Sequence, residues 1–87
     1  LEMGLVNQVV ADEELHRHAM ETAVRLAQGP TAAYAKVKGL FNSSWNNDLE
    51  TQLDAETDAF VEIALTADFQ EGIKAFTERR QARFKGK

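Results

Sequence analysis

Apolar side chains recur at helical spacing in four successive segments of this chain, and this periodicity limits the fold more than any other feature. Helix-breaking sequences separate the first three segments, at Gly29-Pro30 and in the run NSSWNN of residues 42–47. Each apolar stripe covers one helix face and leaves the other faces polar. The sequence therefore predicts about four short helices with tight connections.

Polar residues predict where three of these helices begin. Ser, Thr, Asp and Asn accept hydrogen bonds from first-turn amides, and an acid three residues later can complete a capping box. The predicted caps are Asp12 for the first helix, Asn47 or Asp48 for the third, with Asn47 and Glu50 as a capping box, and Asp68 with Glu71 as a capping box for the fourth. These caps set helix starts near residues 12, 48 and 68.

A β-branched and apolar run, GLVNQVV at residues 4–10, has the composition of a strand. A single strand leaves backbone groups unpaired on both edges, so it requires a sheet outside these 87 residues. Four apolar helix faces also exceed what so short a bundle can bury against itself. The chain begins with Leu1, and its first methionine is Met3. We predict a mainly α chain, with one short N-terminal strand followed by about four helices, cut from a larger protein.

Composition excludes several classes of function. The chain has no cysteine, so neither a disulfide nor a thiolate metal site can form. No apolar run reaches the ~20 residues of a membrane span. The net charge of −4 argues against generic nucleic-acid binding. The sequence predicts a cytoplasmic domain with no membrane and no nucleic-acid partner.

Candidate catalytic and metal-ligating residues are few, and each has a simpler structural explanation. His16 and His18 lie on nearly opposite faces of the first predicted helix, so they cannot chelate one metal. Ser43 and Ser44 lack a base and an orienting acid at motif spacing. Glu56 shares its face with apolar residues, where burial raises the pKa of a carboxyl; its alternative is a structural role, as the partner of a buried Arg or as a backbone cap. We predict no catalytic residue and no metal site within this chain.

The last twenty residues are basic although the whole chain is acidic, because residues 68–87 hold six Lys or Arg against three acids. Phe76 and Arg79, three residues apart, would project from one side of a helix. An aromatic face beside a cation suits an adenine ring and a phosphate, whereas a basic helix end also complements the helix dipole. Both interpretations stay open. Gly72, inside the same predicted helix, indicates close approach of another backbone or a ligand.

The ordered motifs GLVNQVVADEEL, LAQGPTAAYAKVKGLFNSS, LETQLDAE and ADFQEGIKAFTERRQARFKGK resemble the C-terminal region of the enoyl-CoA hydratase/isomerase (crotonase) superfamily. The likeness runs along the full chain, and DFQEGIKAFTERR followed by FKGK is its most specific part. LETQLDAE leans toward the phenylacetate-degradation branch of acyl-CoA isomerases. The resemblance implies a division into residues 1–11, the last strand of a crotonase core, and residues 12–87, a helical region for oligomerisation and ligand covering.

The resemblance also implies an activity. The parent would be an enoyl-CoA hydratase (a lyase) or an enoyl-CoA isomerase of fatty acid metabolism or a related pathway. An oxyanion hole in its core would stabilise a thioester enolate. The catalytic residues would lie upstream, so this fragment would be inactive alone. Coenzyme A would serve as the substrate carrier, with no other cofactor.

The partners implied are an acyl-CoA substrate, the chain's own N-terminal core domain and further copies in a homotrimer or hexamer. Phe76 and Arg79 match the family positions that reach the CoA of a neighbouring subunit near its adenine and phosphate. Arg79 stands where several relatives have Lys, which keeps the charge but changes the hydrogen-bonding geometry. The alternative hypothesis is a free-standing helical protein-interaction module whose basic tail docks acidic or amphipathic partners.

Overall fold

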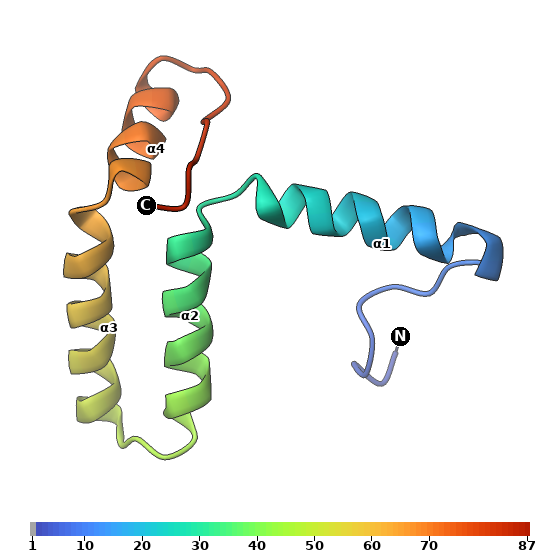
Figure 1. The fold of residues 1–87 in the computed structure, drawn as a ribbon. Helices are drawn as coiled ribbons and strands as arrows, with labels where there is room; N and C mark the ends of the chain where they lie inside the picture. Colours follow the sequence, from blue (N-terminus) through green and yellow to red (C-terminus); the bar gives the residue numbers. More distant parts are fainter. Residues whose placement is uncertain (1) are drawn as a thin grey trace.

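Four α-helices account for most of the chain in the computed structural model, which describes residues 2–87 (Figure 1). They are α1 (Asp12–Ala27), α2 (Thr31–Ser44), α3 (Leu49–Ala64) and α4 (Ala67–Thr77). The prediction of a mainly α chain with about four helices is confirmed. No helix within residues 2–87 is both long and apolar enough to cross a membrane.

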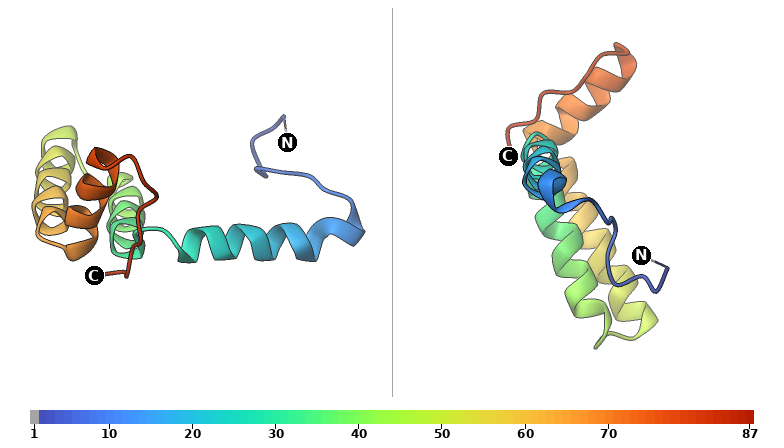
Figure 2. Two further views of the ribbon diagram at one scale, coloured as in Figure 1. Left: turned by 90° about the horizontal axis from the view of Figure 1, so that it is seen from above. Right: turned by 90° about the vertical axis from the view of Figure 1, so that its right-hand side faces the viewer.

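Helices α2 and α3 form an antiparallel hairpin, and α4 continues from the end of α3 at an angle (Figures 1 and 2). Phe60 of α3 and Phe69 of α4 meet edge to face at this bend, with ring centroids 6.0 Å apart and planes at 89°. α1 points away from the other three helices, because the chain breaks at Gly29-Pro30 before α2 begins. The result is a bent hairpin with one projecting arm.

The cap of α3 agrees with the sequence prediction in part. Asp48 is its N-cap, and its carboxylate accepts a hydrogen bond from the Thr51 N–H at 2.8 Å. Hydrogen bonding with the Thr51 side chain, and then this backbone bond, hold the pKa of Asp48 below its ordinary value. The predicted box between Asn47 and Glu50 is wrong, because the Asn47 amide donates to Gln52 Oε1 at 3.0 Å.

The predicted caps of α1 and α4 are corrected by the structure. Ala11 is the N-cap of α1 and makes no side-chain cap bond, so Asp12 lies one residue inside the helix, where its charge still favours the N-terminal dipole. Thr66 is the N-cap of α4, with its hydroxyl oxygen accepting from the Phe69 N–H at 3.2 Å. Asp68 and Glu71 form no capping box, because both carboxylates bind the C-terminal segment instead.

The strand predicted at residues 4–10 is absent from the described structure, where residues 2–11 form turns, bends and extended chain. A strand requires a hydrogen-bonded neighbour, and residues 2–87 contain none. Leu1 lies outside the described residues. Helix α1 starts at Asp12. The division into a last core strand at residues 1–11 and a helical region at residues 12–87 stays a prediction.

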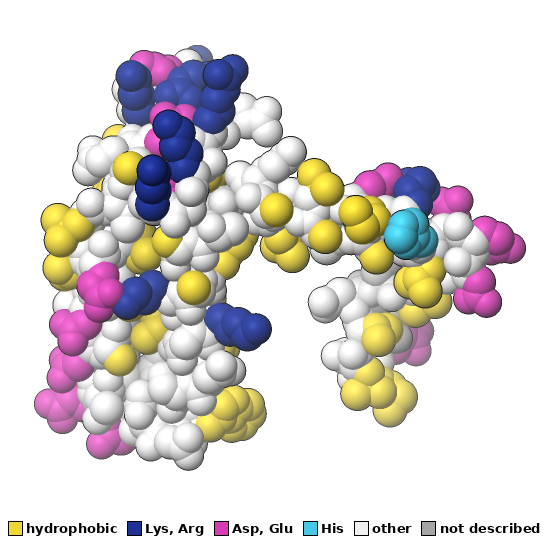
Figure 3. All heavy atoms as spheres, in the orientation of Figure 1, with side chains coloured by type: hydrophobic (Ala, Val, Ile, Leu, Met, Phe, Trp, Pro, Cys, Tyr) yellow, Lys and Arg dark blue, Asp and Glu magenta, His cyan; other side chains and the backbone are white. Residues whose placement is uncertain are grey.

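The chain leaves most of its apolar surface uncovered. Its radius of gyration is 16.5 Å, against about 12 Å for a compact domain of this length. Among the described residues only Ala59, Asp68 and Ala75 are buried. Large apolar side chains lie exposed on all four helices, and Trp45, after α2, is 90% exposed. Yellow apolar side chains accordingly cover much of the arm formed by α1 (Figure 3). These faces fit the prediction that some of this surface meets another domain or subunit.

Candidate functional site

The end of α4 carries the only left-handed residue other than glycine among residues 2–87, Arg79, with φ +53°. The Arg79 N–H donates to the Phe76 carbonyl at 3.2 Å, and the Arg80 N–H donates to the Ala75 carbonyl at 3.0 Å. This pair of bonds is a Schellman motif, whose left-handed position is usually glycine. An arginine there strains the backbone by about 1–2 kcal/mol, so the sequence keeps this side chain at a conformational cost.

Phe76 and Arg79 therefore do not stand on one helix face as their spacing predicted. Phe76 belongs to α4, whereas Arg79 follows the C-cap residue Glu78. The Phe76 ring is 87% exposed and lines an apolar groove of about 370 Å³ together with Ile73 and Phe84. The Arg79 side chain has no hydrogen bond or ion pair within residues 2–87. The Schellman motif joins the two residues through the backbone, and both are exposed.

The C-terminal segment turns back along α4 and ends beside the start of α2 (Figure 1). Asp68, only 4% exposed, accepts from the Lys85 N–H at 2.6 Å and the Gly86 N–H at 2.7 Å. Its own N–H donates to the Lys87 carbonyl at 2.9 Å. Glu71 accepts from the Arg83 N–H at 2.8 Å. We call Asp68, Glu71 and the residues 80–87 that they hold the C-terminal clasp.

Arg80 completes the clasp. Its guanidinium donates to both carboxylate oxygens of Glu71, at 2.6 and 3.0 Å, and to Glu78 at 2.6 Å. The hydrogen bonds from Arg80 and then from the Arg83 N–H lower the pKa of Glu71 to about 2. The bonds to Glu71 and then Glu78 raise the pKa of Arg80. Both groups are charged across the physiological pH range.

The acids of this region are bound within the chain, whereas several of its cations have no ion-pair partner within residues 2–87. Asp68, Glu71 and Glu78 are all engaged within the chain. Five basic side chains of α4 and the returning segment make no ion pair within residues 2–87: Lys74, Arg79, Arg83, Lys85 and Lys87. Lys and Arg side chains gather over this end of the molecule (Figure 3). The end is a locally positive surface on an acidic chain.

Gly72 faces the clasp and not another backbone. A Cβ at this position would lie 3.6 Å from Phe84 Cε1, which is an ordinary van der Waals distance. The expected close approach of another backbone is therefore not found within the described residues, and the nearest neighbour is a ring of the same chain. The roles of Phe84 and Arg80 were not predicted from the sequence. The signal for Arg80 was the presence of acids in α4 with basic residues nine to seventeen positions later.

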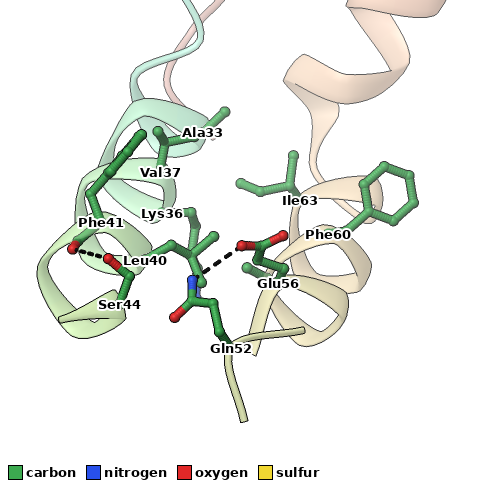
Figure 4. A pocket seen from close by; sticks show the side chains of 11 residues that line it. Ala33, Lys36, Val37, Leu40, Phe41, Ser44, Gln52, Glu56, Phe60 and Ile63 are labelled. Carbon is green, nitrogen blue, oxygen red and sulfur yellow. Dashed lines mark hydrogen bonds between the residues drawn. The ribbon is translucent and has the colours of Figure 1, made fainter. Parts of the chain in front are cut away.

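A second apolar groove, of about 470 Å³, lies between α2 and α3 (Figure 4). Glu56 lines it and accepts from the Gln52 amide at 3.1 Å, so its partner is neither an Arg nor a backbone amide. Lys36 closes one side through an ion pair with Glu62. Ser44 donates to the Phe41 carbonyl at 2.8 Å, which turns its hydroxyl back onto its own helix. The groove accepts apolar groups and presents no nucleophile with a base.

The two histidines lie on α1, away from both grooves. His18 lies within 3.4 Å of Gln8 and 4.0 Å of Glu21. Within residues 2–87 no three His, Cys, Asp or Glu side chains gather closely enough to hold a metal ion. The chain's candidate binding surface is therefore the basic end of α4 with its apolar groove.

The chain is a bent helical hairpin with open apolar faces and a basic, aromatic end. A family profile described as enoyl-CoA hydratase/isomerase matches residues 1–87. The chain belongs to this enoyl-CoA hydratase/isomerase (crotonase) family.

Relatives of this chain are about three times longer than the part they share with it. A probable enoyl-CoA hydratase of Rhodobacter capsulatus is 40% identical over 98% of this chain and 33% of its own length. A 1,2-epoxyphenylacetyl-CoA isomerase of Escherichia coli is 41% identical over 99% and 33%. The crystal structure of an enoyl-CoA hydratase from Polaromonas sp. JS666 superimposes with a TM-score of 0.90 at 32% identity, covering 97% of this chain and 33% of that one. The chain thus spans about a third of these relatives.

Proposed function

We propose that this chain is the C-terminal helical part of an enoyl-CoA hydratase or isomerase that acts on acyl-CoA thioesters. The observation that carries the proposal is the family match along residues 1–87. The open shape and exposed apolar faces support it, because a self-sufficient domain of this length would be more compact. In this proposal the oxyanion hole and the proton-moving carboxylates lie in the remainder of the protein, with no cofactor beyond coenzyme A.

The helices would serve two purposes in the complete enzyme. The exposed faces of α1, α2 and α3 would pack against the enzyme's own core and against other subunits of a trimer or hexamer. The apolar grooves would help to cover the acyl part of the substrate. In this proposal the chain is inactive alone, since the catalytic residues belong to the remainder of the protein.

The basic end of α4 would contact the nucleotide of coenzyme A. An exposed Phe76 ring offers a stacking face for adenine, and Arg79 offers a guanidinium for phosphate. The positive φ of Arg79 supports this role, since a glycine would relieve the strain but would lose the charge.

Two measurements test the proposal. Size-exclusion chromatography with light scattering should show self-association or aggregation of the isolated chain, whereas a stable compact monomer would contradict a role in assembly. In the protein that carries this chain, Phe76→Ala combined with Arg79→Ala should raise the KM for an acyl-CoA substrate. An unchanged KM would contradict the nucleotide contact.

The reaction type depends on residues outside this chain. The similarity to a 1,2-epoxyphenylacetyl-CoA isomerase favours the phenylacetate branch weakly, because a probable enoyl-CoA hydratase is almost equally similar. Assay of the complete protein with an enoyl-CoA and with an epoxyacyl-CoA separates the two. If the protein hydrates the enoyl-CoA and does not convert the epoxyacyl-CoA, the preference for the isomerase branch is wrong.

A further inference from the structure

The C-terminal clasp binds the backbone of basic residues and leaves their charged side chains free. Glu71 accepts from the Arg83 N–H, and Asp68 accepts from the Lys85 N–H. Asp68 also binds the Lys87 carbonyl through its own N–H. None of these three basic side chains has an ion-pair partner within residues 2–87. The carboxylates therefore hold the backbone of these basic residues and do not pair with their charges.

The geometry of the last residues is specific to this clasp. Gly86 has φ +75°, a left-handed conformation that disfavours a side chain, and a Cβ there would lie 2.7 Å from the Thr31 hydroxyl oxygen. The segment is thus held by Asp68, and Gly86 passes close to Thr31 at the start of α2. A tail fixed in this way does not have to lose backbone freedom when a ligand binds, which is the advantage of preorganisation.

We propose that Asp68 and Glu71 are positioning residues that preorganise Arg83, Lys85 and Lys87 for the phosphate groups of a nucleotide-bearing thioester. This inference rests on the proposed function, because it concerns the same ligand. In this inference Arg83, Lys85 and Lys87 bind phosphate in addition to Arg79. Asp68 and Glu71 position these three residues and do not contact the phosphates themselves. Arg80 binds the same carboxylate as the tail, since its guanidinium and the Arg83 N–H both donate to Glu71.

The experiment compares two substrates of the complete protein: an acyl-CoA, and the corresponding acyl-pantetheine, which lacks the nucleotide phosphates. Asp68→Asn should raise the KM for acyl-CoA about tenfold, because the tail must then be ordered during binding. The kcat and the KM for acyl-pantetheine should stay unchanged. Equal losses for both substrates would overturn the proposal, because they would indicate a merely structural role.

A second variant releases the tail without changing any charge. Gly86→Ala should reproduce the selective rise in KM for acyl-CoA, since an L-residue is strained at φ +75° and its Cβ would lie 2.7 Å from the Thr31 hydroxyl oxygen. Gly39→Ala is the matched control, because a Cβ at this position of α2 meets nothing within 4 Å. Hydrogen exchange should show faster exchange of the Lys85 amide in Asp68→Asn and Gly86→Ala, but not in the control.

The outcomes separate this inference from the function on which it rests. If Phe76→Ala and Arg79→Ala raise the KM for acyl-CoA but tail release does not, the clasp proposal is wrong and the nucleotide contact stands. If none of the variants distinguishes acyl-CoA from acyl-pantetheine, both proposals are wrong. A selective effect of tail release together with that of Arg79→Ala supports both.

Discussion

Replacing Arg79 by glycine should stabilise the end of α4 while weakening ligand binding. The φ of +53° costs an L-residue about 1–2 kcal/mol, which glycine does not incur. Glycine also makes the unfolded chain more flexible, at a cost of about 0.4–1 kcal/mol. The net gain is about 0.5–1 kcal/mol in the free energy of local opening. It requires no new contact, because the Schellman hydrogen bonds are already present.

Native-state hydrogen exchange measures this gain at the Arg80 amide, which donates to the Ala75 carbonyl. Exchange in Arg79→Gly should be about two- to fivefold slower than in the wild type. Arg79→Ala is the matched control: it removes the guanidinium but keeps a Cβ, so exchange should stay near the wild-type rate. Both variants should bind 3′-phosphoadenosine 5′-phosphate more weakly, and Arg79→Lys should retain part of the affinity. Equal exchange rates in the glycine and alanine variants would refute the strain argument.

Three further predictions concern α4. Thr66→Ala should destabilise the helix by about 1 kcal/mol, whereas Thr66→Ser should not. Urea unfolding followed by circular dichroism checks this. Equal unfolding midpoints for Thr66→Ala and the wild type would contradict the cap. Gly72→Ala should stabilise α4 by about 1 kcal/mol because its Cβ fits beside Phe84, and a loss in thermal unfolding would instead indicate a closer neighbour. Since the pKa of Glu71 falls from 4.5 to about 2, its stabilising effect should be complete above pH about 4.5 and disappear as the pH falls toward 2. An NMR titration of the Glu71 carboxyl carbon should place its midpoint near 2, and a midpoint near 4.5 would contradict the clasp.

The number and type of the helices could be predicted because apolar periodicity and helix breakers are local signals. Asp48 was predictable as a cap for the same reason, since it needs only the Thr51 amide three residues away. The predicted boundaries at Gly29-Pro30 and near Asp48 agree with α1 ending at Ala27 and α3 starting at Leu49.

The tertiary role of Asp68 and Glu71 could not be predicted in this way. Both had the spacing of a capping box, but each found its partners nine to eighteen residues away in the returning tail. The predicted placement of Arg79 on one helix face with Phe76 was wrong for a related reason. Helical spacing placed it beside Phe76, but the helix stops at Thr77, and only the backbone geometry reveals the left-handed turn. The strand prediction failed because strand propensity without a partner strand forms no hydrogen bonds.

Arg79 and Arg80 are neighbours of identical chemistry, and the structure gives them opposite roles. Arg80 is bound by Glu71 and Glu78, so its charge is largely compensated within the chain. Arg79 has a left-handed backbone conformation and finds no ion-pair partner within residues 2–87. Because the chain has a net charge of −4, an anionic ligand is repelled by much of its surface and attracted where cations lack partners. The positive charge at the end of α4 thus depends less on the number of cations there than on the pairing of the nearby acids with Arg80 and with backbone amides.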